Sequence, residues 1–273
     1  MRVDEVRFEA LGSTCHVLGV GLAPGRLAWA EAWVAERHGR FSRFEPSSEL
    51  AALNRSAGRW APVSADLAAL LAAALDAHRV SGGLVHAGVL GPMLAIGYTR
   101  PLRLGPTAAA PAAAVPPPAL PEMLEVDGDR ARVRAGTGID LGGIAKGWLA
   151  DRLAAELGEN CLVNLGGDLF ARGRGPESEG WPVGMGGQTL LLSEQGAATS
   201  GVRRRTWSWE GETLHHLIDP RTGRPAATDL AEVSVVAGTA TDAEVHAKAA
   251  LLLGAAAAPA YLTGRALAWW LGP

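Results

Sequence analysis

Apolar and polar residues follow two different periods along the first part of the chain. Residues 6–21 alternate at every second position around a Gly-Ser-Thr step, which predicts two short strands joined by a turn. Residues 26–38 and 64–81 repeat Ala, Leu and Trp at helical spacing, so both segments predict helices. We expect the first helix to stop near Gly39 and the second to be capped by Ser64.

Shorter elements are predicted around these helices. Ser47 or Ser48 is placed to cap a short helix that Asn54 closes. A strand-like segment covers residues 131–133. Residues 107–121 are so rich in Pro and Ala that they predict an extended loop, an insertion and not a domain boundary.

Strands and helices also alternate through the second half of the chain. The pattern predicts a helix ending near Leu157, buried strand 161–165, strand 189–192 with a polar turn at 199–201, strand 231–237, a helix capped by Thr241, and an apolar tail at 260–271. We expect the tail to pack on the body of the protein.

Composition limits the kinds of protein that this chain can be. Its 273 residues are 48% hydrophobic and 19% charged, which is enough for a sizeable core in one large domain or two small ones. The formal net charge of −3 gives no basic surplus to attract nucleic acid or an acidic membrane surface, although Arg far outnumbers Lys. A polyanionic partner is therefore not indicated.

The two cysteines and the absence of apolar spans bear on the compartment. Cys15 and Cys161 lie far apart within apolar runs and show no zinc-binding spacing, so we expect buried free thiols. The N-terminal residues resemble no leader peptide, and no long uncharged apolar stretch follows. We expect a cytoplasmic protein that does not insert into a membrane.

Residues 140–151, DLGGIAKGWLAD, form the entry to a predicted helix. Gly142 and Gly143 leave the backbone open to a ligand, the first helical turn offers unpaired N–H groups, and Lys146 adds a positive charge. This combination suits phosphate binding. A loop that packs tightly at a helix start uses glycines in the same way, so both interpretations stay open.

Three further polar segments allow a functional or a purely structural interpretation. His86 on the glycine-rich segment 82–88 is a ligand contact or a locally satisfied histidine. Asn164 and Asp168 around a second Gly-Gly step suit a flat or phosphorylated ligand or a tight hairpin, and the polar segment 215–225 is a site or an elaborate turn.

The last predicted helix carries two polar pairs spaced four residues apart. Glu244 and Lys248 form one pair, and Asp242 and His246 form the other. A Glu four residues ahead of a Lys is the favoured orientation for an exposed helix salt bridge, so this interpretation competes with a site.

Six of these segments occur in the order that is typical of one family. They are Phe41-Ser42-Arg43-Phe44 with Ser48-Glu49-Leu50 and Asn54, Gly82-Gly83, Asp140-Leu141-Gly142-Gly143-Ile144-Ala145-Lys146-Gly147, Asn164-Leu165-Gly166-Gly167-Asp168, Thr199-Ser200-Gly201, and His216-Leu217-Ile218-Asp219-Pro220-Arg221-Thr222-Gly223. In these segments the chain resembles the ApbE-like flavin transferases, the FAD:protein FMN transferases. The segments together span most of the chain.

The resemblance implies an α+β fold in which mixed sheets and flanking helices enclose a flavin pocket, with residues 1–273 as a single domain. It implies transfer of the FMN half of FAD to a threonine hydroxyl of a partner protein, with release of AMP and assistance by Mg²⁺. The implied partner is a flavin-dependent electron-transfer protein. The positions it assigns to FAD are Leu11, Phe44, Leu84, Val85, His86, Asp140, Lys146, Asn164, Gly166, Gly167, Leu217, Asp219 and Thr222. It assigns the carbonyl of Gly143 to the metal. We expect Glu244 to be a further metal ligand, and Lys146, Glu244 and Lys248 to be the catalytic residues.

Two positions depart from the family pattern. His86-Ala87-Gly88 stands where the family has Asp-Pro-Thr, so a carboxylate at one end of FAD is missing. Glu244 and Lys248 stand where the family has an Asp and a Thr as metal ligands, and an ammonium group has no lone pair for a metal. Lys248 either replaces the metal's charge or pairs with Glu244 in a metal-free site, unless a shifted register makes Asp242 and His246 the ligands.

These departures keep two alternative functions open. The chain is a flavin transferase, an FAD-binding protein that has lost transfer activity, or an FAD pyrophosphatase in which water replaces the threonine.

Overall fold

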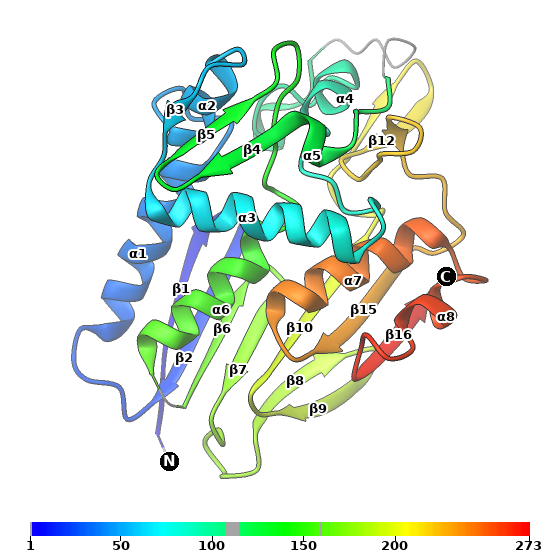
Figure 1. The fold of residues 1–273 in the computed structure, drawn as a ribbon. Coiled ribbons are helices and arrows are strands. Elements are labelled where there is room, and N and C mark those ends of the chain that lie inside the picture. The colour runs from blue at the N-terminus through cyan, green and yellow to red at the C-terminus, as the bar shows by residue number, and fades with distance from the viewer. Residues whose placement is uncertain (1, 108–114, 159) are drawn as a thin grey trace. The chain divides into compact units, whose positions relative to one another are not determined.

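The computed structural model describes residues 2–107, 115–158 and 160–273, and it has an α+β fold, as the sequence resemblance implied (Figure 1). The chain divides into two compact units, each made of separate stretches. Unit 1 comprises residues 1–38, 144–200 and 232–273, and unit 2 comprises residues 39–143 and 201–231. The prediction of one domain over 1–273 stays a prediction.

Unit 1 is built on a seven-stranded sheet with the order β1-β2-β6-β7-β10-β15-β16. The strands are β1 (Val3–Ala10), β2 (Ser13–Val20), β6 (Cys161–Leu165), β7 (Leu169–Arg172), β10 (Gln195–Gly201), β15 (Glu232–Ala237) and β16 (Ala268–Gly272). The predicted N-terminal hairpin is confirmed, and the apolar tail packs as predicted because β16 pairs with β15. Residues 199–201 are not the predicted polar turn, because they continue β10.

The two faces of this sheet are covered by different elements. Helices α6 (Ala145–Leu157) and α7 (Ala240–Leu253) pack on one face, and α8 (Ala258–Leu262) packs against α7. The hairpin of β8 (Trp181–Met185) and β9 (Gln188–Leu192) covers the other face.

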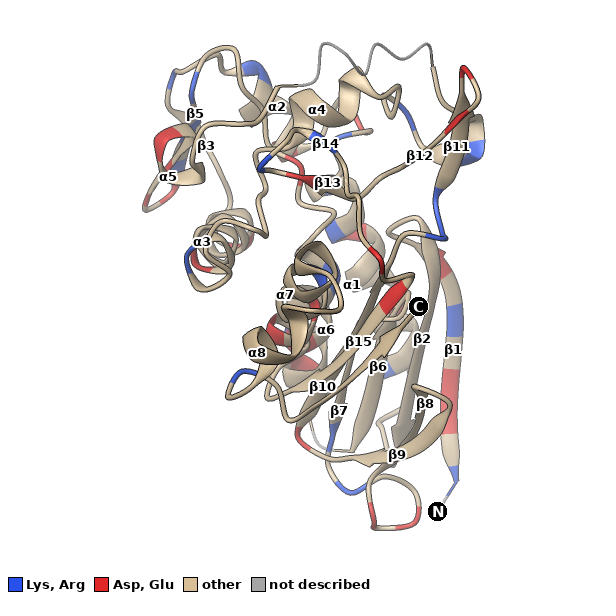
Figure 2. Cartoon of the chain, turned by 90° about the vertical axis from the view of Figure 1, so that its right-hand side faces the viewer, with Lys and Arg blue, Asp and Glu red and all other residues tan. Residues whose placement is uncertain are grey.

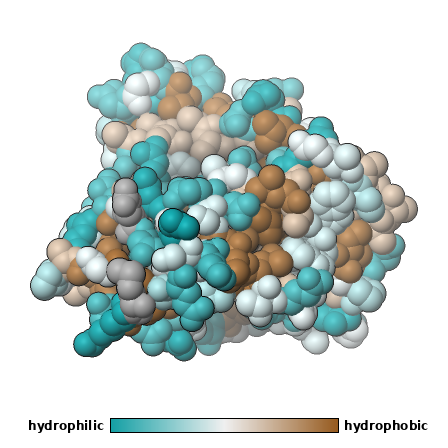
Figure 3. All heavy atoms as spheres, turned by 90° about the horizontal axis from the view of Figure 1, so that it is seen from below, coloured by the Kyte–Doolittle hydropathy of each residue, from teal (hydrophilic) through white to brown (hydrophobic). Residues whose placement is uncertain are grey.

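Alternate residues of a strand therefore enter different cores. Leu162 packs in the cluster under the hairpin, whereas the Cys161 thiol lies against the carbonyl of Ala154 in α6. Leu191 and Leu267 stay exposed, and Figure 3 shows hydrophobic residues gathered on part of the face seen from below. Both cysteines are free and buried, as predicted, and burial raises the pKa of Cys15 to about 11 and that of Cys161 to about 12.

Strand β1 lies at the edge of the seven-stranded sheet and carries charges of both signs (Figure 2). Glu5 lies 2.7 Å from the Nε2 atom of His16 and 3.7 Å from the guanidinium of Arg7. Charged side chains along an edge strand hinder pairing with another chain, so this edge is protected from aggregation.

Helix α1 (Arg26–Phe41) begins in unit 1 and ends in unit 2. The prediction that it stops near Gly39 is confirmed to within two residues, because the helix ends at Phe41. Gly39 lacks the positive φ angle of a helix-terminating glycine, so it weakens the helix without ending it.

Unit 2 combines short helices with small two- and three-stranded sheets. Its other elements are α2 (Glu49–Arg55), β3 (Ala61–Pro62), α3 (Ala65–Val80), α4 (Leu90–Ala95), the 3₁₀ helix η1 (Leu102–Leu104), α5 (Leu120–Met123), β4 (Leu124–Asp127), β5 (Arg130–Val133), β11 (Thr206–Trp209), β12 (Glu212–His215), β13 (Ile218–Asp219) and β14 (Arg224–Pro225). One hydrophobic cluster joins Ile96 and Met93 near α4 to Trp207 and Leu214 of the β11–β12 hairpin.

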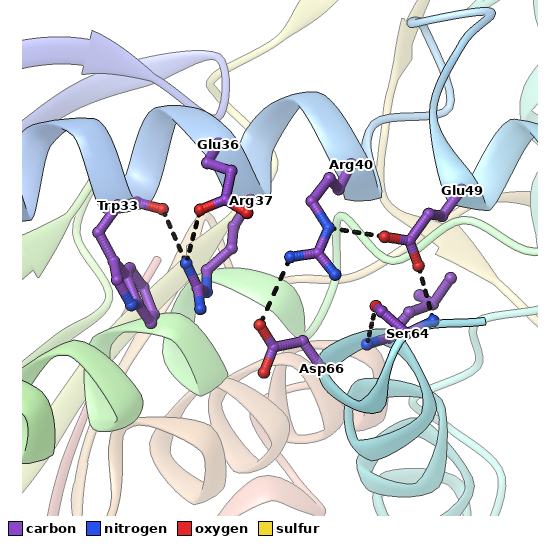
Figure 4. Close-up of polar contacts among 8 residues, drawn as sticks. Trp33, Glu36, Arg37, Arg40, Glu49, Ser64 and Asp66 are labelled. Atoms are coloured by element: carbon purple, nitrogen blue, oxygen red, sulfur yellow. Dashed lines mark hydrogen bonds and ion pairs between the residues drawn. The ribbon is translucent and has the colours of Figure 1, made fainter. Parts of the chain in front are cut away.

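Capping side chains fix α2 and α3 as the sequence predicted. The Oγ atom of Ser48 accepts a hydrogen bond from the N–H of Ala51, and Ser64 caps α3 in the same way. Figure 4 shows that Glu49, the first residue of α2, connects Arg40 to the cap of α3: it accepts from the backbone N–H of Ser64 at 2.9 Å and pairs with Arg40 at 2.6 Å.

Three predicted boundaries are wrong by a few residues. Asn54 lies inside α2 instead of closing it, since its side chain is held by the backbone of Ile139. Thr239, not Thr241, caps α7, because Asp151 binds the Thr241 side chain. In the predicted Pro/Ala-rich loop, 108–114 lie outside the described residues, and 120–121 begin α5.

Candidate functional site

Four side chains of alternating charge, two buried carboxylates and two partly buried lysines, meet in unit 1, where α6 begins. The Nζ atom of Lys146 pairs with Asp168 and lies 3.9 Å from the Oε1 atom of Glu244. The Nζ atom of Lys248 lies 4.0 Å from the same oxygen. The side chains of Asp168 and Glu244 are 2% and 4% exposed, and those of the two lysines are 14% and 13% exposed. The predicted interpretation of Glu244 and Lys248 as an exposed helix pair is therefore wrong.

Close contact between α6 and α7 positions Glu244. The Oε2 atom of Glu244 accepts a hydrogen bond of 2.9 Å from the backbone N–H of Gly147. A side chain at Gly147 would meet the carbonyl oxygen of Ala240 at 2.5 Å, so only glycine permits this approach. Glu244 thus accepts a hydrogen bond from one of the N–H groups at the start of the helix, which the sequence indicated as donors to a phosphate.

Asp151 holds the two helices together one turn further along α6. Its carboxylate accepts hydrogen bonds from the backbone N–H groups of Ala240 and Thr241 and from the Thr241 hydroxyl, at 2.7, 2.9 and 2.6 Å. These groups form the N-terminal end of α7, where a negative charge is favourable. Asp151 and Gly147 therefore fix the part of α7 that carries Glu244.

The second Gly-Gly step turns the chain from β6 to β7 next to this cluster. Gly166 and Gly167 have φ angles of 76° and 103°, and the side chain of Asn164 accepts from the N–H of Gly167 at 2.8 Å. A side chain at Gly166 would meet Ser13, which brings the β1–β2 turn alongside. Leu11 in that turn has a φ of 56°, a strained value for leucine.

The residues around Glu244 do not fit the Mg²⁺ that the resemblance implied. One Glu244 oxygen is used by the Gly147 N–H, and the other faces two ammonium groups, which repel a dication and cannot ligate it. In the shifted register, Asp242 is exposed and the Nδ1 atom of His246 is hydrogen-bonded to the Tyr261 hydroxyl at 2.9 Å. Across residues 2–107, 115–158 and 160–273, no three His, Cys, Asp or Glu side chains gather to hold a metal.

Asp140 connects three segments of unit 2 through its side chain and its backbone N–H. Its Oδ2 atom accepts from Arg43 at 2.5 Å, its Oδ1 atom accepts from the N–H of Gly142 at 2.8 Å, and its own N–H donates to Ala87 at 2.7 Å. The Arg43–Asp140 ion pair is only 5% and 10% exposed. Asp140 therefore shapes the Gly142–Gly143 turn and ties it to the segment that contains His86.

Arg43 also contacts two aromatic side chains, of which one, Phe44, was predicted to contact FAD. Its guanidinium carbon lies 4.0 Å from the ring centre of Phe44 and 4.7 Å from that of Tyr98. The rings of Phe44 and Tyr98 are themselves 5.5 Å apart. The two rings are tilted at 58° to each other, so Arg43 and the two rings form one cationic and aromatic cluster.

The ring of His86 is used for structural hydrogen bonds. Its Nδ1 atom accepts from the N–H of Gly88 at 2.9 Å, so its Nε2–H donates to the carbonyl of Pro118 at 3.0 Å. Burial, aided by the neighbouring His78, lowers the pKa of His86 to about 4. Of the adjacent predicted contacts, Leu84 is half-buried, and Val85 is buried with its N–H bonded to Ser81.

The predicted contacts Leu217, Asp219 and Thr222 surround a tight turn between β13 and β14. Asp219 is bound by the guanidinium and N–H of Arg221, and its carbonyl accepts from the N–H of Thr222 at 3.1 Å. The Leu217 carbonyl accepts from the N–H of Ala226. Self-contained hydrogen bonding thus accounts for the conformation of this turn.

The structure groups the predicted residues by unit. Leu11, Lys146, Asn164, Gly166, Gly167, Glu244 and Lys248 lie in unit 1, whereas Phe44, Leu84, Val85, His86, Asp140, Gly143, Leu217, Asp219 and Thr222 lie in unit 2. The residues assigned to FAD, metal or catalysis from the sequence did not include Asp168, Arg43 or Asp151, although Asp168 was noted beside the second Gly-Gly step. Asp168 and Arg43 stand inside motifs, but nothing in the sequence links Asp151 to residues ninety positions away.

Comparison with known proteins finds matches over most of the chain. The model of the ApbE family matches residues 11–269. A protein of Treponema pallidum named FAD:protein FMN transferase is 36% identical over 248 residues. The match covers 76% of this chain and 65% of the Treponema protein, so this chain spans just under two thirds of that relative. A Haemophilus influenzae protein with the same name is 26% identical, and the match covers 82% of this chain and 71% of that protein.

Solved structures share the fold. The apo flavinyl transferase ApbE of Pseudomonas stutzeri superposes with a TM-score of 0.84 at 23% identity and covers 99% of this chain and 90% of its own. The ApbE protein of Thermotoga maritima gives a TM-score of 0.85, also at 23% identity, over 99% and 94% of the two chains. Taken with the family match over 11–269, these findings establish that the chain belongs to the ApbE family.

Proposed function

We propose that this chain is an FAD:protein FMN transferase, which transfers FMN from FAD to a threonine hydroxyl of a partner protein. The observation that carries the proposal is the charged cluster of Lys146, Asp168, Glu244 and Lys248 at the start of α6, in which both carboxylates are buried. Relatives that bear this name support the same activity.

The proposed reaction is a phosphoryl transfer. The threonine oxygen bonds to the phosphorus of the FMN half, the bond from that phosphorus to the bridging oxygen breaks, and the electron pair leaves with AMP. The threonine proton is released to water as the new ester forms. Such a reaction needs positioning and neutralisation of charge more than covalent participation by the enzyme.

The unit 1 residues have the charges for this task. We assign Lys146 to the pyrophosphate, because it stands in the first turn of α6, where the helix dipole also favours an anion. Asp168 and Glu244 hold the two ammonium groups, and Asn164, Gly166 and Gly167 form a turn beside Lys146. Phe44, Leu84, Val85, His86, Asp140, Leu217, Asp219 and Thr222 stay proposed FAD contacts, as does Leu11.

Mg²⁺ is not assigned a step in this proposal. The resemblance implies it, but Glu244 is committed to Gly147 and faces two ammonium groups. A Mg²⁺ ion that acts here therefore has to arrive with the phosphate oxygens of FAD, which are the oxygen ligands that it prefers.

The partner is proposed to be a flavin-dependent electron-transfer protein with an accessible threonine, and the compartment is proposed to be the cytoplasm. In the parts of the chain that the structure describes, every helix is too short or too polar to span a membrane.

Mass spectrometry of a threonine-containing partner protein incubated with FAD tests this function. We expect the partner to gain the mass of an FMN phosphoryl group and AMP to appear in equal amount. FAD bound but unchanged identifies a binding protein instead, and AMP with free FMN identifies a pyrophosphatase. Either outcome with a competent threonine partner overturns the proposal.

A further inference from the structure

Both lysines of the chain lie at the same carboxylate. Of the 25 Lys and Arg residues, only Lys146 and Lys248 are lysines. Their Nζ atoms lie 3.9 and 4.0 Å from one oxygen, Oε1 of Glu244. The chain uses arginine at every other basic position, so lysine is used only at this site.

The chemistry of lysine explains this choice. An ammonium group is a compact point charge on a flexible stem, whereas a guanidinium is wide, planar and directs its donors in a fork. A compact cation next to a carboxylate is the closest side-chain equivalent of a bound metal ion. Both distances to Glu244 exceed a hydrogen bond, so Glu244 holds the ammonium groups by charge without binding either tightly.

The four side chains of the cluster balance one another. Asp168 and Glu244 carry two negative charges, and Lys146 and Lys248 carry two positive charges, so their formal sum is zero. With a neutral residue at position 248 the sum would be −1 at a nearly buried site, which favours uptake of a cation. The positive charge of Lys248 neutralises the site, so that no further cation is needed, and it also repels a cation that approaches.

We propose that the Lys248 ammonium takes the place of a divalent cation in this chain, so that the site binds the FAD pyrophosphate without Mg²⁺. The inference rests on the proposed function for the identity of the anion. The replacement of the metal charge rests only on the contacts of Lys248, Lys146 and Glu244, and it can be tested without FAD.

The first experiment measures Mg²⁺ binding to the FAD-free protein by thermal unfolding. Lys248→Thr supplies an oxygen ligand beside Glu244, so about 10 mM Mg²⁺ should raise its Tm by about 2–4 °C, the shift expected for a ligand well above its Kd. The wild type and the control Arg79→Thr should not respond. Arg79 is a fitting control because its side chain is 73% exposed and pairs with Asp76 on the surface of α3. A wild-type Tm that rises with Mg²⁺ as much as that of Lys248→Thr overturns the proposal.

The second experiment measures FAD affinity by flavin fluorescence, in EDTA and in Mg²⁺. The wild type should bind FAD within about twofold in the two buffers, whereas Lys248→Met, which keeps the length of the side chain but not its charge, should bind about tenfold or more weakly in EDTA. Lys248→Thr should regain affinity with Mg²⁺. A wild type that loses tenfold in EDTA, or a Lys248→Met variant that binds like the wild type, overturns the proposal.

The two experiments separate this inference from the proposed function. If the folded wild type binds no FAD in either buffer, the proposed function fails, and the Tm response to Mg²⁺ still decides whether Lys248 replaces a metal. If either variant fails to fold, the wild-type response to EDTA and to Mg²⁺ remains decisive.

Discussion

At the scale of single residues, His86 was predicted to contact FAD, but both of its ring nitrogens form hydrogen bonds within the protein. Its ring joins the glycine-rich segment to Pro118, and both nitrogens are used in doing so. A histidine bound in this way is neutral and both of its ring nitrogens are engaged, so any contact with FAD must come from its ring face or its backbone.

Replacing His86 should change the dependence of stability on pH. The pKa of His86 is about 4 in the folded protein, against an ordinary value of 6.5. Its neutral form therefore stabilises the fold fully above pH 6.5, and this contribution is lost as the pH falls from 6.5 towards 4, because the unfolded chain takes up the proton first.

His86→Gln should accordingly cost stability at pH 7.5 by loss of its hydrogen bonds, and the difference from the wild type should shrink by about 1–2 kcal/mol at pH 5. Urea unfolding at the two pH values measures this difference. A gap that stays constant would show that His86 does not titrate below its ordinary pKa.

At the scale of elements, the contact of α6 with α7 determines where Glu244 lies. Gly147 permits the approach, and Asp151 binds the first N–H groups of α7. Both residues stand on one face of α6, four positions apart, so a single helix face sets the position of the charged cluster.

Two glycines in helices should respond in opposite ways to alanine. Gly147→Ala should destabilise the protein by about 1–3 kcal/mol, because its Cβ would meet the backbone of Ala240. Gly39→Ala should stabilise it by about 0.5–1 kcal/mol, because no atom lies within 4 Å of where the new Cβ would be and because α1 loses a flexible residue. Chemical denaturation of the two variants tests the pair, and equal effects would contradict the described contact of α6 with α7.

Asp151 should act on the site as well as on stability. Asp151→Ala leaves two N–H groups and a hydroxyl of α7 without their acceptor, which should cost about 1–3 kcal/mol. It should also weaken FAD binding, since Glu244 lies one turn along α7. Asp151→Asn keeps one oxygen and should restore part of the affinity, while the exposed Asp76→Ala should leave it unchanged. Full FAD affinity in Asp151→Ala at a temperature where it is folded would exclude a positioning role.

The elements that the sequence predicted correctly are those with local causes. Ser48 and Ser64 cap the helices that follow them, and the N-terminal hairpin follows from alternation around one turn. The failures have distant causes. Asn54 is bound by Ile139, eighty-five residues away, and Thr241 is bound by Asp151, so neither residue follows its local capping preference. The burial of Glu244 and Lys248 likewise depends on the packing of α6 and α7, which helical spacing does not reveal.

At the scale of the whole molecule, each compact unit is made from distant parts of the chain. Unit 2 joins residues 39–143 to residues 201–231, and its hydrophobic cluster takes members from both stretches. Trp207 lies at this junction, because its ring is 7% exposed and its Nε1–H donates to the carbonyl of Ile96 at 3.0 Å. Side chains with contacts of such long range determine whether a discontinuous unit folds cooperatively.

Truncating Trp207 should therefore loosen a segment more than one hundred residues away. Trp207→Ala should destabilise unit 2 by about 3–5 kcal/mol and raise amide hydrogen exchange in α4, whose C-terminal carbonyl it binds. Trp60 provides the control in the same unit, since it is 38% exposed and its ring lies under the guanidinium groups of Arg130 and Arg132. Trp60→Ala should cost less than about 1 kcal/mol and leave exchange in α4 unchanged. If instead α4 kept its protection in Trp207→Ala, residues 39–143 would hold their structure without the β11–β12 hairpin, and unit 2 would not be a cooperative unit.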